Sequence, residues 1–233
     1  MFVYAIKTIQ KSMFPIFRMD QINPNQQTIS VVGTGFFISA NGNFVSVAHV
    51  FNNATANTKF QYRGMPPEKV ENPSVTIEEV IRDDGNDIFI GRIRKKTDFL
   101  RLSKQLPEIG RSVCIGGYPL AQLVANQQGI DVSGVRRYFQ PSFVLDHGKA
   151  DSDDGHGKII SHDGFLVRDF GLFGMSGGPV FDTSGMVLGV QGSVTQPRVS
   201  TGRGGRSISV ENALAIRSNL ILEFIKDRRI RFN

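Results

Sequence analysis

The stretch GMSGGP, residues 174–179, is the part of this sequence that decides the fold. Glycines on both sides of a serine permit the backbone angles of a sharp turn, from which the Ser176 hydroxyl would project into open space. The backbone N–H groups of Gly174 and Ser176 would then point at one spot, where they would stabilise an oxyanion formed when a carbonyl is attacked. The alternative interpretation is a tight glycine turn between two strands.

The same stretch also fits the pattern G-x-S-x-G, which marks the nucleophile of α/β-hydrolases. Chain order excludes that fold, because an α/β-hydrolase needs its histidine after the serine. All of the histidines precede Ser176 in this chain: His49, His147, His156 and His162.

His49 and Asp87 are the candidate partners of the serine. A serine hydroxyl needs an adjacent general base, and His49 ends the apolar run FVSVAH that follows an Asn-Gly hairpin signal. Asp87 begins the apolar strand DIFIG and is the best candidate for the carboxylate that orients the imidazole. Asp83 and Asp84 compete with Asp87. The alternatives are a core histidine bonded to a carbonyl and an aspartate that caps its own turn.

Three segments together resemble the trypsin/chymotrypsin-like serine proteases, most closely the disulfide-free bacterial branch of the Deg/Htr type. They are GTGFFISANGNFVSVAHV at 33–50, NDIFIGRI at 86–93 and GMSGGPVFDTSGMVLGV at 174–190. The order histidine, aspartate, serine is also the order in that family. Weaker similarity in EIGRSVCIGGYPL at 108–120 and NALAIRSNLILEFI at 212–225 extends the resemblance to nearly the whole chain.

The resemblance implies an all-β fold of two packed six-stranded antiparallel β-barrels (chymotrypsin-like) with a short C-terminal helix and an active site between the barrels. The expected divisions are an N-terminal extension at 1–29, a first barrel at 30–105, a second barrel at 106–210, and a final strand with the helix at 211–233.

The resemblance also implies a role for each candidate residue. Ser176 would be the nucleophile, His49 the general acid and base, and Asp87 the orienting carboxylate, with Gly174 and Ser176 supplying the oxyanion N–H groups. The reaction would be acyl transfer from a peptide bond to Ser176, followed by hydrolysis. Residues expected to contact substrate are Phe170, Leu172, Val190, Gln191, Gly192 and Ser193. Because no acid stands at the expected base of the specificity pocket, we expect a neutral or apolar residue before the cleaved bond.

Met175 departs from the digestive members of the family, which carry an aspartate there that pairs with a newly cut N-terminus. Activation by N-terminal cleavage is therefore not expected. The oxyanion turn must be set by its own packing, by an activating partner protein or by substrate. A catalytically silent or partner-activated binding module with a protease fold is the competing function.

Composition supports many short strands, since the 233 residues include 25 glycines and 10 prolines. The single cysteine, Cys114, excludes an intramolecular disulfide and a CxxC metal site. A reducing compartment is the easier assumption. Neither an export signal nor an apolar run long enough to span a membrane is evident in the sequence, so we expect a cytoplasmic protein without membrane contact.

Two polar segments raise other possibilities. Histidines and aspartates gather at 146–163, but their spacing matches no calcium loop, so neither a metal nor a cofactor is expected. The segment QPRVSTGRGGR at 196–206 is similar to nucleic-acid-binding RGG segments. A flexible loop beside the cleft is the preferred interpretation, and a protein or peptide substrate is the expected partner.

Overall fold

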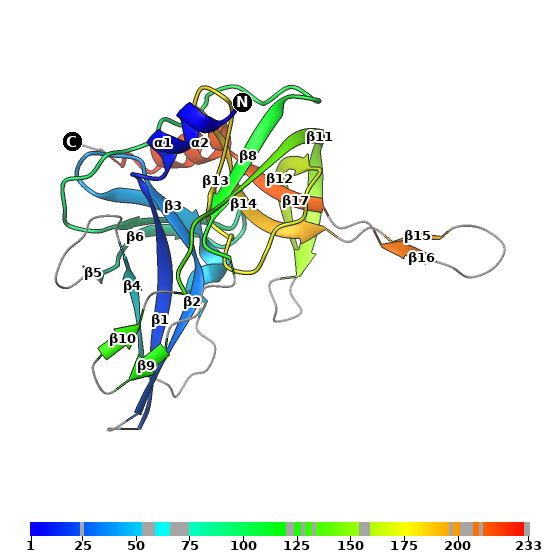
Figure 1. Ribbon diagram of the computed structural model, residues 1–233. Coiled ribbons are helices and arrows are strands. Elements are labelled where there is room, and N and C mark those ends of the chain that lie inside the picture. Colours follow the sequence, from blue (N-terminus) through cyan, green and yellow to red (C-terminus); the bar gives the residue numbers. More distant parts are fainter. Residues whose placement is uncertain are drawn as a thin grey trace.

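Two antiparallel β-sheets, one from each half of the chain, form the fold (Figure 1). The computed structural model describes residues 1–23, 26–52, 59–65, 75–119, 124–126, 129–131, 134–153, 159–195, 198–200, 207–209 and 212–230.

The first sheet has seven strands in the order β5-β4-β1-β2-β3-β7-β6. The strands are β1 (Met13–Asn23), β2 (Gln26–Phe37), β3 (Asn43–Val47), β4 (Lys59–Gly64), β5 (Val75–Thr76), β6 (Glu78–Asp83) and β7 (Ile88–Arg92). The Asn-Gly turn predicted from the sequence joins β2 to β3, and Gly42 has the positive φ of 82° that such a turn requires.

The second sheet is a closed barrel in the order β11-β12-β17-β14-β13-β8. Its strands are β8 (Ser112–Gly117), β11 (Tyr138–Asp153), β12 (Ile159–Val167), β13 (Pro179–Phe181), β14 (Val187–Thr195) and β17 (Asn212–Arg217). Two small hairpins stand apart from it: β9 (Val124–Asn126) with β10 (Gly129–Asp131), and β15 (Arg198–Ser200) with β16 (Ser207–Ser209). The β15–β16 hairpin projects well away from the barrel (Figure 1).

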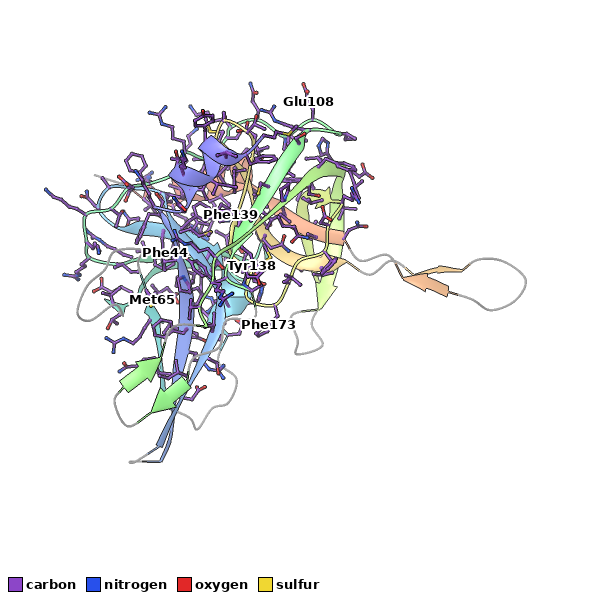
Figure 2. The ribbon with its side chains drawn as sticks, in the orientation of Figure 1. Phe44, Met65, Glu108, Tyr138, Phe139 and Phe173 are labelled. Atoms are coloured by element: carbon purple, nitrogen blue, oxygen red, sulfur yellow. The ribbon has the colours of Figure 1, made fainter. Side chains whose placement is uncertain are left out.

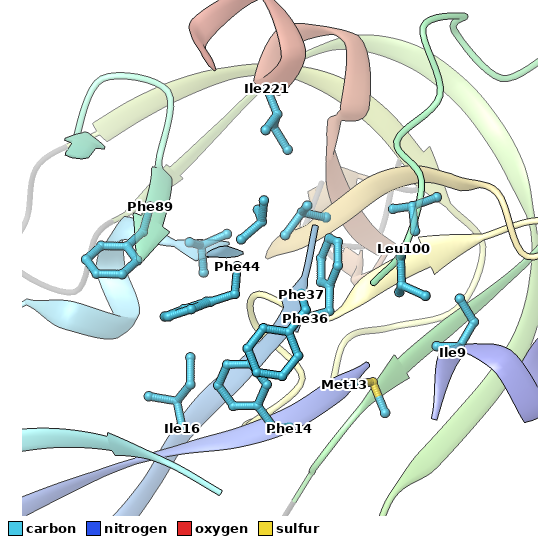
Figure 3. Close-up of a cluster of buried hydrophobic side chains, with 14 of the residues drawn as sticks. Ile9, Met13, Phe14, Ile16, Phe36, Phe37, Phe44, Phe89, Leu100 and Ile221 are labelled. Carbon is cyan, nitrogen blue, oxygen red and sulfur yellow. The ribbon is translucent and has the colours of Figure 1, made fainter. Parts of the chain in front are cut away.

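A cluster of phenylalanines fills the core of the first half of the chain (Figure 3). The ring centroid of Phe14 lies 4.7 Å from that of Phe37 and 5.1 Å from that of Phe44. All five residues of β3 are buried, which is consistent with a strand that is covered on both faces. Aromatic packing therefore fixes β3, the strand that leads to His49.

Three short helices complete the described elements: α1 (Val3–Ile9), the 3-10 turn η1 (Ala48–Phe51) and α2 (Ser218–Asp227). The helix predicted near the C-terminus is thus present, and it buries Ile221 and Ile225. In the part of the chain that the structure describes, no helix has both the length and the apolar character needed to cross a membrane.

The N-terminal residues belong to both halves rather than to a separate extension at 1–29. The ring of Phe2, just before α1, packs edge-on against Phe181 of the second barrel at 6.0 Å. Strand β1 then pairs with β2 and β4 in the first sheet. The first half therefore begins near Met13 instead of residue 30.

The predicted fold class is confirmed in outline, with one correction. The structure has one closed six-stranded barrel, whereas the first half is an open half-barrel sheet of seven strands. The edges of that sheet are β5 and β6, and they do not pair with one another among the described strands. Strand β5 has only two residues, so it offers few backbone groups for closure.

Cys114 lies on β8, fully buried between β11 and β13. Burial raises the pKa of its thiol to about 12, because the thiolate would lose its hydration. Since the thiolate is the reactive form, we expect native protein not to react with a disulfide reagent at pH 8, and urea-unfolded protein to react with one equivalent per chain. Rapid stoichiometric labelling of native protein would contradict this packing.

Candidate active site

His49 is placed by the pairing of β3 with β7. Val47 pairs with Ile88, so the residues that follow Val47 lie opposite those that precede Ile88. The Ala48 N–H donates to the Asp87 carbonyl at 3.2 Å, and the chain then turns into η1. The strand register thus brings two distant residues, His49 and Asp87, together before any side chain interacts.

Two hydrogen bonds from His49 reach the Asp87 carboxylate. The backbone N–H of His49 donates to Oδ1 at 2.8 Å, and Nδ1 lies 2.7 Å from Oδ2. The Asp87 side chain is 3% exposed and that of His49 is 29% exposed. A carboxylate accepts hydrogen bonds, so Nδ1 carries the proton and Nε2 has a free lone pair. This arrangement suits a base that is held in one tautomer.

Asp87 adopts a left-handed backbone conformation, with φ of 54°, which aspartate tolerates better than most residues. Its competitors have other partners. Asp83 accepts hydrogen bonds from the backbone N–H groups of Gly85 and Asn86, and Asp84 pairs with Arg82. Asp83 is therefore the aspartate that caps the turn, and Asp87 is the one that contacts the histidine.

Ser176 stands at the start of the second of two consecutive β-turns. The Met175 N–H donates to the Leu172 carbonyl at 2.9 Å, and the Gly178 N–H donates to the Met175 carbonyl at 2.8 Å. Gly174 and Gly177, the third residues of these turns, have φ of 95° and 85°. A positive φ at that position defines a type II turn and favours glycine.

The turn type determines where the Gly174 N–H points, because types I and II differ by a flip of the central peptide. Among the described residues, neither the Gly174 nor the Ser176 N–H has a hydrogen-bond acceptor. Two unpaired donors two residues apart are the arrangement needed to bind a developing oxyanion.

The Ser176 hydroxyl and His49 lie on the two sides of the contact between the two halves. The Thr34 N–H donates to the Ser176 carbonyl at 2.8 Å. A Cβ on Gly33 would lie 2.9 Å from that carbonyl oxygen and 2.6 Å from Cγ2 of Val50, the residue after His49. In the described part of the chain, the Ser176 hydroxyl has one hydrogen bond, to the Gly192 carbonyl at 3.4 Å, which is long.

The sequence pattern of the trypsin-like peptidase domain family matches residues 33–190, which include all three of these side chains. The chain belongs to the trypsin-like peptidase domain family.

Two other comparisons show similarity in sequence and in fold. Over 167 residues the chain is 28% identical to an uncharacterized protein, y4bJ, of Sinorhizobium fredii. That match covers 72% of this chain and 22% of y4bJ, so this chain spans less than a quarter of that relative. The fold is similar to the crystal structure of the Rv3671c protease from M. tuberculosis in its active form, with a TM-score of 0.64 at 18% identity. This likeness covers 95% of this chain and 82% of that chain.

Met175, the departure from digestive members of the trypsin-like family, is fully buried in the core of the second barrel. Its Cα and Cγ would lie about 3 Å from a Cβ on Gly117, so the barrel wall and the side chain are in close contact. An apolar anchor thus occupies the position where other members place a charge.

Residues expected to contact substrate divide into two groups. Phe170 is 48% exposed, and Gln191 lies against Gly171, where its Nε2 would be 2.6 Å from an added Cβ. Gln191 is only 2% exposed and Val190 is completely buried, so neither side chain is open to solvent as Phe170 is. The remaining members of the trypsin-like substrate region are Leu172, Gly192 and Ser193, which flank the serine turn or continue β14.

Phe173 precedes Gly174 in the first turn and is 74% exposed (Figure 2).

Only parts of the two polar segments belong to the described residues. The Nε2 atom of His147 lies 2.5 Å from the carbonyl oxygen of Pro107. His156, Arg203 and Arg206 lie outside the described residues, and the described part of the chain holds no group of three potential metal ligands.

Thr34 is the site residue that sequence reasoning missed. It lies within the GTG stretch at 33–35, but no local pattern marks a threonine whose partners are about 140 residues away. The contacts of Thr34 could not be predicted because its partners are distant in the sequence, and not because of its residue type.

Proposed function

We propose that this trypsin-like domain is a serine endopeptidase that hydrolyses peptide bonds through an acyl-enzyme on Ser176. The observation that carries the proposal is the buried Asp87 carboxylate bonded to His49 Nδ1, in a chain whose serine turn has two N–H groups without an acceptor among the described residues. These groups supply a base, a nucleophile and an oxyanion site, the three parts that acyl transfer requires.

The proposed reaction begins with rotation of the Ser176 side chain away from the Gly192 carbonyl. The hydroxyl then donates to the free Nε2 of His49, which takes the proton as the oxygen attacks the substrate carbonyl. Catalytic hydrogen bonds are often loose before substrate binds, so the 3.4 Å contact with Gly192 is consistent with this step.

The same groups complete the cycle. The N–H groups of Gly174 and Ser176 hold the oxyanion, and the His49 imidazolium is stabilised by Asp87 until it protonates the leaving amine. A water molecule then enters, gives a proton to His49 and attacks the acyl carbonyl. The bond between the acyl carbon and Oγ of Ser176 breaks, His49 returns the proton to Oγ, and the second product leaves as a carboxylic acid.

A fluorophosphonate probe tests the proposal directly, since it modifies a serine only when a base activates the hydroxyl. Wild-type protein is expected to gain one probe per chain at a peptide containing Ser176, as measured by mass spectrometry. Ser176→Ala should gain none. Ser184→Ala, which removes a serine that bonds to Asp182 in a remote turn, should label normally. An unlabelled, correctly folded wild-type protein would point to a protease fold without turnover.

A further inference from the structure

We propose that Thr34 is a positioning residue that holds the oxyanion turn in place against the first sheet, an inference that rests on the proposed peptidase function. Thr34 belongs to β2 of the first sheet, whereas the turn belongs to the second half of the chain. The side chain is fully buried, so its polar groups must be satisfied within the protein.

Every polar group of Thr34 has a partner at the contact between the two halves. Its N–H donates to the Ser176 carbonyl and its hydroxyl donates to the Gly174 carbonyl, both at 2.8 Å. Its hydroxyl also accepts from the Tyr118 N–H at 3.2 Å, and its carbonyl accepts from the Ser46 hydroxyl at 2.8 Å. Thr34 therefore binds the carbonyls of the two residues whose N–H groups are the proposed oxyanion donors.

The direction of the Thr34 hydroxyl proton follows from these partners. Because the Tyr118 N–H donates to the oxygen, the proton has to point elsewhere, and the Gly174 carbonyl is the acceptor in reach. Threonine is also stiff about χ1, so the hydroxyl has little freedom to turn away. One side chain thus fixes the Gly174 carbonyl in one place.

The turn needs such a contact, since glycine adopts positive and negative φ with similar ease. Nothing in Gly174 itself favours the value of 95° over its negative counterpart. The peptide that follows Gly174 is held at its oxygen by Thr34 and at its nitrogen by the Leu172 carbonyl. Tyr118 also requires a glycine here, since its carbonyl oxygen is 2.5 Å from the position of a Cβ on Gly174.

This account explains how the turn forms without the aspartate that other members use. The packing of Met175 anchors the turn from inside the second barrel, and Thr34 orients it from the first half. The same threonine also contributes to the contact between the halves that carry the base and the nucleophile.

The test compares Thr34→Val, which keeps the shape and removes the hydroxyl, with Thr34→Ser, which keeps the hydroxyl. We expect Thr34→Val to lower kcat about 10- to 100-fold with KM nearly unchanged, as for loss of a group that acts on oxyanion binding. Inhibition by a peptide aldehyde, whose adduct places an oxyanion in the hole, should weaken by a similar factor. Thr34→Ser should restore most of the activity.

Ser218→Ala is the matched control, because it removes a fully buried hydroxyl that donates to a carbonyl at 2.8 Å, far from the turn. It should lower Tm and leave kcat unchanged. Wild-type kcat in Thr34→Val, or equal losses in the Val and Ser variants, would overturn the positioning role.

A crystal structure of Thr34→Val gives a readout that does not depend on activity. The positioning role predicts that the Gly174 and Ser176 carbonyls move away from β2, or that the turn adopts more than one conformation. A single type II turn identical to that of the wild type would refute it, even if the wild-type protein proved to be inactive. Failure of wild type to react with the fluorophosphonate probe would instead remove the proposed function alone.

Discussion

Replacing His49 with alanine is expected to lower kcat by about four to six orders of magnitude. The variant loses the lone pair that accepts the Ser176 proton, and the hydroxyl at its ordinary pKa is a poor nucleophile. The Asp87 carboxylate cannot substitute for the imidazole, because it is buried and its contacts are with the His49 backbone and ring. Cleavage of a fluorogenic peptide, followed with purified variants, measures the effect.

His147→Ala provides the matched control, since it removes another partly buried histidine that has a hydrogen-bond partner outside the site. Its kcat should stay within about twofold of wild type, as for most changes remote from the chemistry. Retained hydrolysis in His49→Ala, at more than about a hundredth of the wild-type rate, would mean that the base has been wrongly assigned.

Gly177→Ala is expected to have the second large effect, on both stability and activity. Its φ of 85° already disfavours a side chain by about 1–2 kcal/mol. An added Cβ would also lie 2.1 Å from the Ser46 hydroxyl and 2.2 Å from the Thr34 carbonyl, so the serine turn and β2 have to separate. We expect a total loss above about 4 kcal/mol in the free energy of unfolding, and loss of detectable hydrolysis.

The Gly185→Ala variant separates the cost of a positive φ from the cost of the close approach of other atoms. Gly185 has the same φ of 85°, but the nearest atom to an added Cβ there is 3.8 Å away. It should lose only the backbone contribution and keep normal kcat. Urea unfolding of both variants gives the comparison: equal losses would show that the close approach at Gly177 is unimportant, whereas failure of Gly177→Ala alone to fold would support it.

The candidate site could be predicted largely from local patterns. Glycines beside Ser176, and an apolar strand before His49, are features that a few neighbouring residues impose on the backbone. Asp87 rather than Asp83 contacts the histidine, because a residue just before β7 is placed by the strand register. The catalytic roles of these residues stay predictions until activity is measured.

Features that depend on distant pairing were missed. The sequence analysis predicts an extension where the structure has strand β1. Its partners, β2 and β4, are determined by pairing across the sheet and not by the amino-acid pattern of β1 itself. Val190 is expected to line the substrate pocket, but residues 187–192 of β14 are all buried. Because this part of the strand is covered on both faces, alternation along the sequence does not tell which side chains face a pocket.

The path of the first residues constrains how the molecule can be handled and controlled. Phe2 packs against the second barrel, whereas the strand that begins at Met13 belongs to the first sheet. The amino-terminal segment therefore contacts both halves of the molecule. Removing residues 1–12 would take this contact away and uncover Phe181, so we expect the shortened protein to have a lower Tm than the full chain.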